Sequence, residues 1–243
     1  IWNTGKPLAE KTVEQAAQRV EQLRPMAVIN LSLGLASRPN ASFKGTFKQI
    51  KDFRDTNVLV YTQMKGDKVT GTMPMSPLDL GESHTAVRMY LEALEDYGKL
   101  VARDADPTSE WMHKSLDDWI EDSQEIFSFQ HVTGRFQRKG SLDVTDTGAS
   151  KADTTQEILN EWRPQYADLP VEAYDLRRFG ATSLALQGFA VGDIQKLLGH
   201  KDIAMTRSYI WDSPYLGFKD AGDMYDSLAY VQAKPMAELM DII

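Results

Sequence analysis

The chain contains 243 residues, of which 42% are hydrophobic and 26% are charged, and a chain of this length can bury the core of one large domain or of two small ones. It contains no cysteine, which excludes disulfides, thiol catalysis and cysteine-based zinc sites. No apolar run approaches the roughly 18 residues that span a bilayer, so we expect a soluble protein without a membrane partner. The absence of cysteine is compatible with the cytoplasm, where we expect the protein to be.

The formal net charge of −8 is concentrated in one part of the chain. Residues 79–125 contain 13 acidic and 4 basic residues, a net charge of −9 out of the total of −8, so the other residues together carry +1. The overall acidity therefore does not exclude a polyanionic partner for the remaining segments. The four His residues are scattered and supply no close pair of ligands, so we expect no metal and no other cofactor.

The N-terminal third is predicted to contain two helices and a β-hairpin. Apolar residues at helical spacing predict an amphipathic helix over 7–23, and a mostly apolar segment predicts a second, buried helix over 26–39. Two strands over 58–64 and 68–75 flank Gly66-Asp67, a dipeptide typical of hairpin turns.

The middle of the chain is predicted to be helical on both sides of a polar segment. The pattern favours helices over about 83–103 and 108–127, separated by a break that contains Pro107. The polar, glycine-bearing segment 129–153 is interpreted as a loop or a ragged hairpin. A further helix is predicted at about 154–163. We expect the pair Trp111 and Trp119 to lie in the core rather than to stack on bases.

Three short helices are predicted within 174–209, and a further helix within 226–243. In the first of the three, one apolar face is expected to pack inward; it consists of Leu176, Phe179, Ser183 and Leu186. The fold class that follows is mainly α with a small antiparallel β-sheet (α+β).

The segment 174–209 also places three polar groups where they can meet. Arg177 lies near the start of its helix, at the edge of the apolar face. Gly199 is a helix stop, so His200 is the first residue beyond the helix end. Asp202 is a candidate N-cap for the helix that carries Tyr209. A guanidinium, an imidazole and a phenol on one side of a helical cluster can converge on a single ligand.

This segment resembles the second signature box of the tyrosine recombinases, the family of phage integrases and of Xer-like and Cre-like site-specific recombinases. That box runs from His-x-Leu-Arg through Ala-Thr and Ile-Gln-x-Leu-Leu-Gly-His to a nucleophilic Tyr. The match here is free of gaps over fifteen positions: Leu176, Arg177, Ala181, Thr182, Leu184, Gly188, Ile194, Gln195, Leu197, Leu198, Gly199, His200, Ile203, Thr206 and Tyr209. So long a match is far more specific than a short motif.

The resemblance implies further active-site residues outside this box. An Arg on an earlier helix corresponds to Arg38, which precedes Pro39, although the usual Glu of that motif is missing. A Lys in the following hairpin corresponds to Lys65, with Lys68 as the alternative. Where the family usually has the His of His-x-x-Arg, this chain has Tyr174, a departure that keeps a hydrogen-bond donor but changes the proton chemistry.

The implied chemistry is metal-independent and ATP-independent cleavage and rejoining of double-stranded DNA through a 3′-phosphotyrosine. The resemblance implies that Tyr209 is the nucleophile and that Lys65 protonates the leaving 5′ oxygen. It also implies that Arg38 and Arg177 neutralise the phosphoryl oxygens and that His200 hydrogen-bonds the phosphate. Tyr174 is a further candidate donor. The candidate DNA contacts are Arg178, Arg135, Arg138, Lys139, Lys68 and Arg207.

The resemblance covers roughly residues 7–241 and implies one catalytic domain over 1–243. Residues 76–165 form its variable middle region and residues 212–243 its C-terminal tail, whose helix is expected to dock into a neighbouring protomer of a synaptic tetramer. The alternative is that this helix packs on its own domain. An N-terminal core-binding domain is expected to be missing from this chain, which begins at Ile1 rather than at Met.

Other readings of the same residues remain open at this stage. Taken singly, each candidate residue is commonly an exposed or helix-terminal side chain, and the acidic segment 79–125 is either a solvated helical face or a surface for a basic partner. The same active site serves hairpin telomere resolvases and type IB topoisomerases. A DNA-binding protein that kept the fold and lost turnover is the non-enzymatic alternative.

Overall fold

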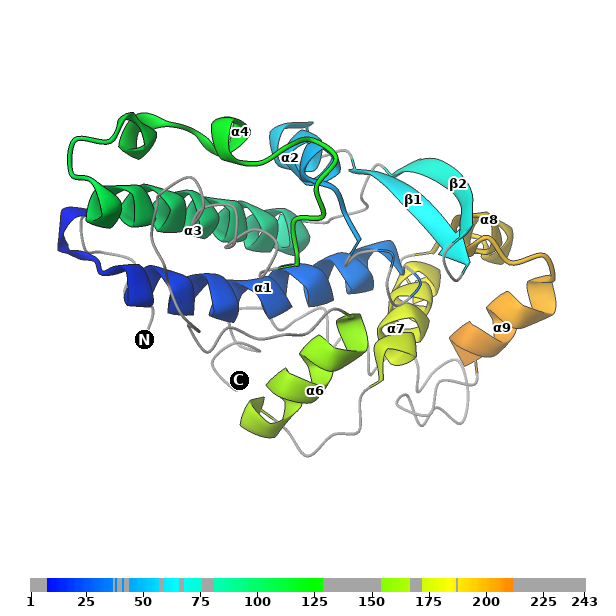
Figure 1. Cartoon of the computed structure of the whole chain (residues 1–243). Helices are drawn as coiled ribbons and strands as arrows, with labels where there is room; N and C mark the ends of the chain where they lie inside the picture. Colours follow the sequence, from blue (N-terminus) through cyan, green and yellow to red (C-terminus); the bar gives the residue numbers. More distant parts are fainter. Residues whose placement is uncertain are drawn as a thin grey trace.

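Helices dominate the structure, which confirms the mainly α class expected from the sequence. The computed structural model (Figure 1) describes residues 8–36, 38, 41, 44–56, 59–65, 68–75, 81–128, 154–166, 172–186 and 188–211. The predicted segment 129–153 and the predicted C-terminal helix within 226–243 lie outside these ranges.

The longest N-terminal element is the helix α1, Val13–Leu35, which follows a short 3-10 helix, η1 (Leu8–Glu10). Its start is fixed by a capping box, because the Thr12 hydroxyl accepts a hydrogen bond from the backbone N–H of Gln15 while the Gln15 side chain accepts one from the backbone of Thr12. Its end is marked by Ala36, which has the left-handed φ of 45°.

The prediction of two helices over 7–23 and 26–39 is therefore wrong: Pro25 lies inside a single helix. Proline removes one backbone hydrogen bond and normally bends or breaks a helix. Here the apolar face continues across it, with buried side chains on both sides: Val20, Leu23, Ala27, Val28, Leu31 and Leu35. Burial of this face offsets the lost hydrogen bond.

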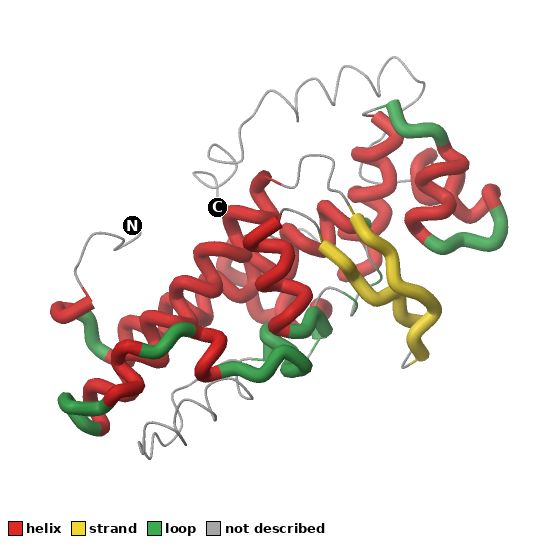
Figure 2. The backbone as a smooth tube through the Cα atoms, turned by 90° about the horizontal axis from the view of Figure 1, so that it is seen from above, coloured by secondary structure: helices red, strands yellow, loops and turns green. Residues whose placement is uncertain are grey.

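The main core forms where α1 packs against the helix α3, Gly81–Ala105, which runs beside it (Figure 1). The helix α2, Phe47–Thr56, adds Phe47, Ile50 and Phe53 to this core. It leads directly into the strands β1, Leu59–Lys65, and β2, Lys68–Met75, which pair antiparallel as a twisted ribbon (Figure 2).

The hairpin carries one of the sequence-predicted site residues at its end. Lys65 is the last residue of β1 and lies opposite Lys68, the first residue of β2. The predicted turn residues between them lie outside the described ranges. The register shifts between Gln63 and Met64, which is a β-bulge or a similar irregularity.

The prediction of a helix over 108–127 is wrong. Only a 3-10 helix, η2 (Glu110–His113), and the short helix α4 (Leu116–Trp119) form there, because Ser109 and Ser115 each start a new helix by capping it. The segment after α4 binds the start of α2 instead: the backbone N–H of Phe47 donates to the carbonyl of Gln124 at 2.7 Å.

Trp111 and Trp119 lie close together in this region, as expected for a pair in the core. Their ring centroids are 4.9 Å apart, Trp119 is buried, and Trp111 packs against the main core.

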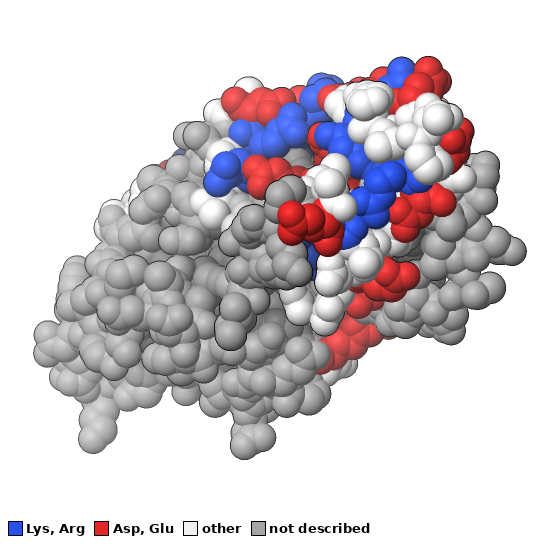
Figure 3. Space-filling model, turned by 90° about the vertical axis from the view of Figure 1, so that its left-hand side faces the viewer, with Lys and Arg blue, Asp and Glu red and all other residues white. Residues whose placement is uncertain are grey.

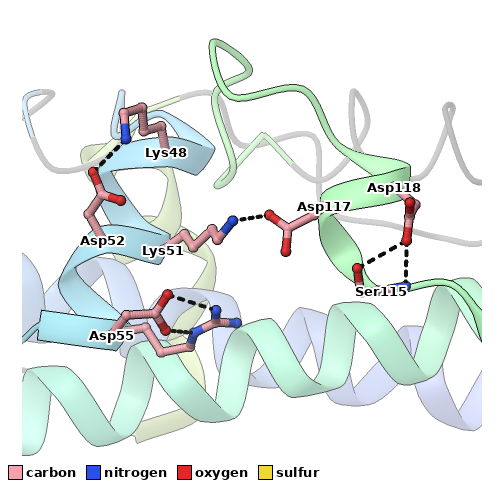
Figure 4. Close-up of polar contacts among 8 residues, drawn as sticks. Lys48, Lys51, Asp52, Asp55, Ser115, Asp117 and Asp118 are labelled. Carbon is pink, nitrogen blue, oxygen red and sulfur yellow. Dashed lines mark hydrogen bonds and ion pairs between the residues drawn. The ribbon is translucent and has the colours of Figure 1, made fainter.

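Basic side chains meet the acidic segment 79–125 at two places. Lys51 of α2 pairs with Asp117 of α4, and the nearby Lys48 pairs with Asp52 of its own helix (Figure 4). At the N-terminal end of α1, Lys11 pairs with Asp96 of α3, and basic and acidic side chains lie interspersed on this face (Figure 3). The acidity of the segment is thus partly neutralised by contacts within the chain.

Four helices complete the described chain: α6 (Thr155–Tyr166), α7 (Ala173–Leu186), α8 (Val191–Leu198) and α9 (Ile203–Trp211). The prediction of three helices within 174–209 is confirmed. The helices α7, α8 and α9 lie at the C-terminal end of α1, away from the C-terminal end of α3 (Figure 1). Within the ranges described, none of the helices has the length and apolarity needed to cross a bilayer.

The inward face of α7 differs from the predicted one. Leu176 is buried as expected, but Phe179 is 41% exposed. Its neighbours Gly180 and Ala181 turn inward instead. They do so because α1 approaches α7 so closely that an added Cβ at Gly180 would overlap the carbonyl oxygen of Leu33.

This close approach yields a prediction about stability. Gly180→Ala should lower the free energy of unfolding by about 1–3 kcal/mol or more, because the added methyl group meets backbone rather than a movable side chain. Urea-induced unfolding of the full chain measures this change.

Gly192 in α8 is the matched control, because a Cβ there would have nothing within 4 Å. Gly192→Ala should be neutral or stabilising by up to about 1 kcal/mol, as expected for alanine in a helix. Equal effects of the two substitutions would contradict the close contact of α1 and α7.

Candidate active site

Arg177 of α7 is almost completely buried, with 2% of its surface exposed, between the ends of two other helices. One terminal nitrogen, Nη1, donates to the carbonyl of Ala36 at the end of α1 (2.9 Å), and the other, Nη2, donates to the carbonyl of Leu198 at the end of α8 (2.6 Å). The last carbonyls of a helix lack partners within the helix and carry partial negative charge. The guanidinium thus fixes the relative positions of α1, α7 and α8.

His200 is placed beside this guanidinium by the end of α8. Gly199 takes the left-handed φ of 64° that ends the helix. Two hydrogen bonds then hold the His200 backbone to Gln195: the His200 N–H donates to the Gln195 carbonyl at 3.1 Å, and the Gln195 side chain donates to the His200 carbonyl at 3.0 Å. In this position the Nε2 atom of His200 lies 3.2 Å from Nη2 of Arg177.

Tyr209 approaches the same imidazole from α9. The centroids of the Tyr209 and His200 rings are 4.9 Å apart, and the rings are nearly perpendicular at 83°. The Cζ atoms of Arg177 and Arg178 lie 5.9 and 5.7 Å from the centroid of the Tyr209 ring. The Thr182 hydroxyl of α7 donates to the carbonyl of Tyr209 at 3.1 Å and so ties α9 to α7.

Arg38 lies close enough to this cluster to act on its electrostatics. The pKa of His200 is lowered from the ordinary value of 6.5 to about 4, chiefly by burial and additionally by the charges of Arg177 and Arg38. The Arg38 side chain is half-buried and follows the end of α1, two residues after the carbonyl that Arg177 binds. The structure therefore brings together Arg177, His200 and Tyr209, and the charge of Arg38 acts on the imidazole.

The other sequence-predicted residues have different positions. Tyr174 lies in the first turn of α7, one turn before Arg177, with 49% of its surface exposed. Arg178 is half-buried beside Tyr209 and forms an ion pair with Asp175 at 3.6 Å, whereas Arg207 is exposed on α9. The backbones of Lys65 and Lys68 are described, but their side chains are not. Three predicted DNA contacts lie outside the described ranges: Arg135, Arg138 and Lys139.

Three residues that orient this cluster were not predicted as site residues, although the matched pattern contained them. Thr206 has its hydroxyl oxygen 3.0 Å from Nδ1 of His200, while Thr182 and Gln195 hold the backbones of Tyr209 and His200. Thr206 lies three residues before Tyr209, on the same side of one helix turn, and this spacing is a signal that the sequence offered.

No metal centre accompanies these residues in the part of the chain that is described, where no three or more His, Asp and Glu side chains are grouped so that they could hold an ion.

The environment of His200 gives a second prediction. In the absence of DNA, the His200 imidazole should titrate with a pKa of about 4, measured from the pH dependence of its NMR signals and assigned by their loss in His200→Gln. Because the imidazole is easier to protonate in the unfolded chain, its contribution to stability is complete above a pH of about 6.5 and is lost as the pH falls towards 4. A titration midpoint at the ordinary value would contradict the described environment.

A scan against protein-family models matches residues 6–214 of the chain to the phage integrase family. A search of the curated proteins and a search of the solved structures found no match. The family model covers most of the chain, including every element from α1 to α9. The chain therefore belongs to the phage integrase family, whose members bind DNA and recombine it.

Proposed function

We propose that this chain is the catalytic domain of a site-specific tyrosine recombinase that cleaves and rejoins DNA through a 3′-phosphotyrosyl intermediate. The observation that carries the proposal is the meeting of Arg177, His200 and Tyr209: the guanidinium lies 3.2 Å from the imidazole, whose ring centroid lies 4.9 Å from that of the phenol. A phosphodiester held at this place would contact a cation and a nucleophile together.

The two arginines suit the charge that develops on the phosphoryl oxygens. Each guanidinium is permanently charged and has five N–H groups, so Arg177 keeps donors for a phosphate beyond those that bind the two carbonyls. Arg177 is fixed by two helix-end carbonyls before any substrate arrives, and donors that need no reorganisation stabilise a transition state most effectively. Arg38 supplies the second charge from the end of α1. Arg178, whose Cζ atom lies 5.7 Å from the centroid of the Tyr209 ring, adds a contact to the DNA backbone.

The proposed cleavage transfers the phosphodiester bond from DNA to the protein. The Tyr209 oxygen attacks the phosphorus while its proton passes to solvent water, and the bond between phosphorus and the 5′ oxygen breaks. Lys65, at the end of β1, gives a proton to that leaving oxygen. The phosphotyrosine retains the bond energy, so a 5′-hydroxyl of another strand reverses the step without ATP. Tyr174 holds the phosphate by a hydrogen bond, and His200 lies beside the Arg177 guanidinium that neutralises it.

The partners proposed are double-stranded DNA and further copies of the chain. Strand exchange needs two cleaved duplexes held together, which favours a synaptic tetramer. The C-terminal residues 226–241 supply the apolar side chains for the contact between copies, and these residues lie outside the described ranges. The further DNA contacts are Arg135, Arg138, Lys139, Lys68 and Arg207.

Trapping the covalent product tests this proposal. DNA of the replicon that encodes the chain is lightly nicked with a nuclease, so that cleavage near a nick releases a short fragment and leaves the protein attached. The chain should form a DNA adduct that survives denaturant, and Tyr209→Phe should abolish it, because the phenyl ring keeps the packing on His200 but has no nucleophilic oxygen.

Tyr97→Phe is the matched control, since Tyr97 is a buried tyrosine of α3 in the main core. The adduct should persist in this variant. The topology of the products then distinguishes recombination from hairpin formation and from relaxation. If a preparation that binds DNA forms no adduct, the chain is a DNA-binding protein without turnover and the proposal fails.

A further inference from the structure

We infer that Thr206 is a positioning residue of this active site, whose hydroxyl oxygen accepts the Nδ1–H of His200 and thereby fixes the imidazole in the tautomer that presents an unprotonated Nε2 to Arg177. The inference about orientation rests on the described contacts, and its consequence for catalysis rests on the proposed function.

The tautomer follows from the two partners of the ring. Arg177 has only N–H donors, and its Nη2 lies 3.2 Å from Nε2 of His200. A hydrogen on Nε2 would point at another hydrogen, so Nε2 must be the acceptor of this pair. In a neutral imidazole the proton then sits on Nδ1. The low pKa of His200, which burial and the two arginines cause, agrees with a neutral ring.

Thr206 supplies the acceptor that this tautomer needs. Its Oγ1 lies 3.0 Å from Nδ1, and the residue is completely buried, so water does not take its place. An Nδ1–H without a partner at this position would be a buried unsatisfied donor, which is costly. A hydroxyl oxygen accepts such a bond while its own hydrogen turns elsewhere.

The position of Thr206 in α9 explains how it acts on the reaction. It lies one helix turn before Tyr209, and its hydroxyl links the helix that carries the nucleophile to the imidazole beyond α8. The same contact therefore sets the direction of the His200 ring and its distance from the Tyr209 ring, against which it lies edge to face. A group that orients a functional imidazole through its far nitrogen is a recurring device in active sites.

The test uses the full chain with ¹⁵N-labelled histidine and no DNA. The four His residues make assignment practical, because His200→Gln removes one set of signals. In the unaltered chain Nδ1 of His200 should show the ¹⁵N shift of a protonated nitrogen and Nε2 that of an unprotonated one. Thr206→Val keeps the shape of the side chain but removes the acceptor, so the two shifts should move towards each other. Thr206→Ser keeps the oxygen and should restore the original pattern.

The same variants are then compared in the nicked-DNA assay. Thr206→Val should slow adduct formation by about 10- to 100-fold, the range seen when a group that orients a metal-binding imidazole is lost, while DNA binding stays unchanged. Thr206→Ser should recover most of the rate. Thr155→Val, which removes a buried hydroxyl from α6 rather than from the helices that carry the cluster, should leave both the ¹⁵N shifts and the adduct rate unchanged.

Two results would overturn the inference: a proton on Nε2 in the unaltered chain, or ¹⁵N shifts that Thr206→Val does not move. An unchanged adduct rate in Thr206→Val would refute its catalytic part. If the unaltered chain forms no adduct, the proposed function fails, while the NMR spectrum still decides whether Thr206 orients His200.

Discussion

The active-site end of this molecule depends on one buried cation, the guanidinium of Arg177. Removing such a group from water costs several kcal/mol, and charge-assisted hydrogen bonds of about 1.5–3 kcal/mol each offset that cost. The acceptors are the carbonyls of Ala36 and Leu198, which stand at helix ends and have no partner within their own helices. The stabilisation of the charge and the joining of three helices are thus the same interaction.

This arrangement makes the rest of the site a consequence of helix packing. Gly180 lets α7 approach α1 closely enough for Arg177 to reach the end of α1. The end of α8 presents both a carbonyl to Arg177 and, two residues later, the imidazole of His200. The helix α9 then brings Tyr209 against that imidazole. Because rigid elements hold each group, little reorganisation is needed when a phosphate binds, which suits the proposed chemistry.

Residues that start or stop helices made much of this active-site end predictable from the sequence. The Gly199 stop and the Asp202 cap define the end of α8 and the start of α9 within a few residues, and Asp202 does accept from the N–H of Ala204. The effects of contacts between distant segments could not be predicted from the sequence. Helix α1 continues through Pro25 because its buried face extends on both sides, and the predicted helix over 108–127 gives way because its last residues bind the start of α2. The hydrogen bond of Thr206 to His200 likewise depends on two helices meeting.

The central claim is that the Tyr209 oxygen becomes linked to DNA, and mass spectrometry of a trapped adduct tests it most directly. After digestion with nuclease and trypsin, the relevant peptide spans residues 208–219 and contains two tyrosines, Tyr209 and Tyr215. Fragmentation of this peptide locates the nucleotide. The account predicts that the nucleotide is attached through its 3′-phosphate to Tyr209. Attachment to Tyr215, to any other residue, or through a 5′-phosphate would contradict it.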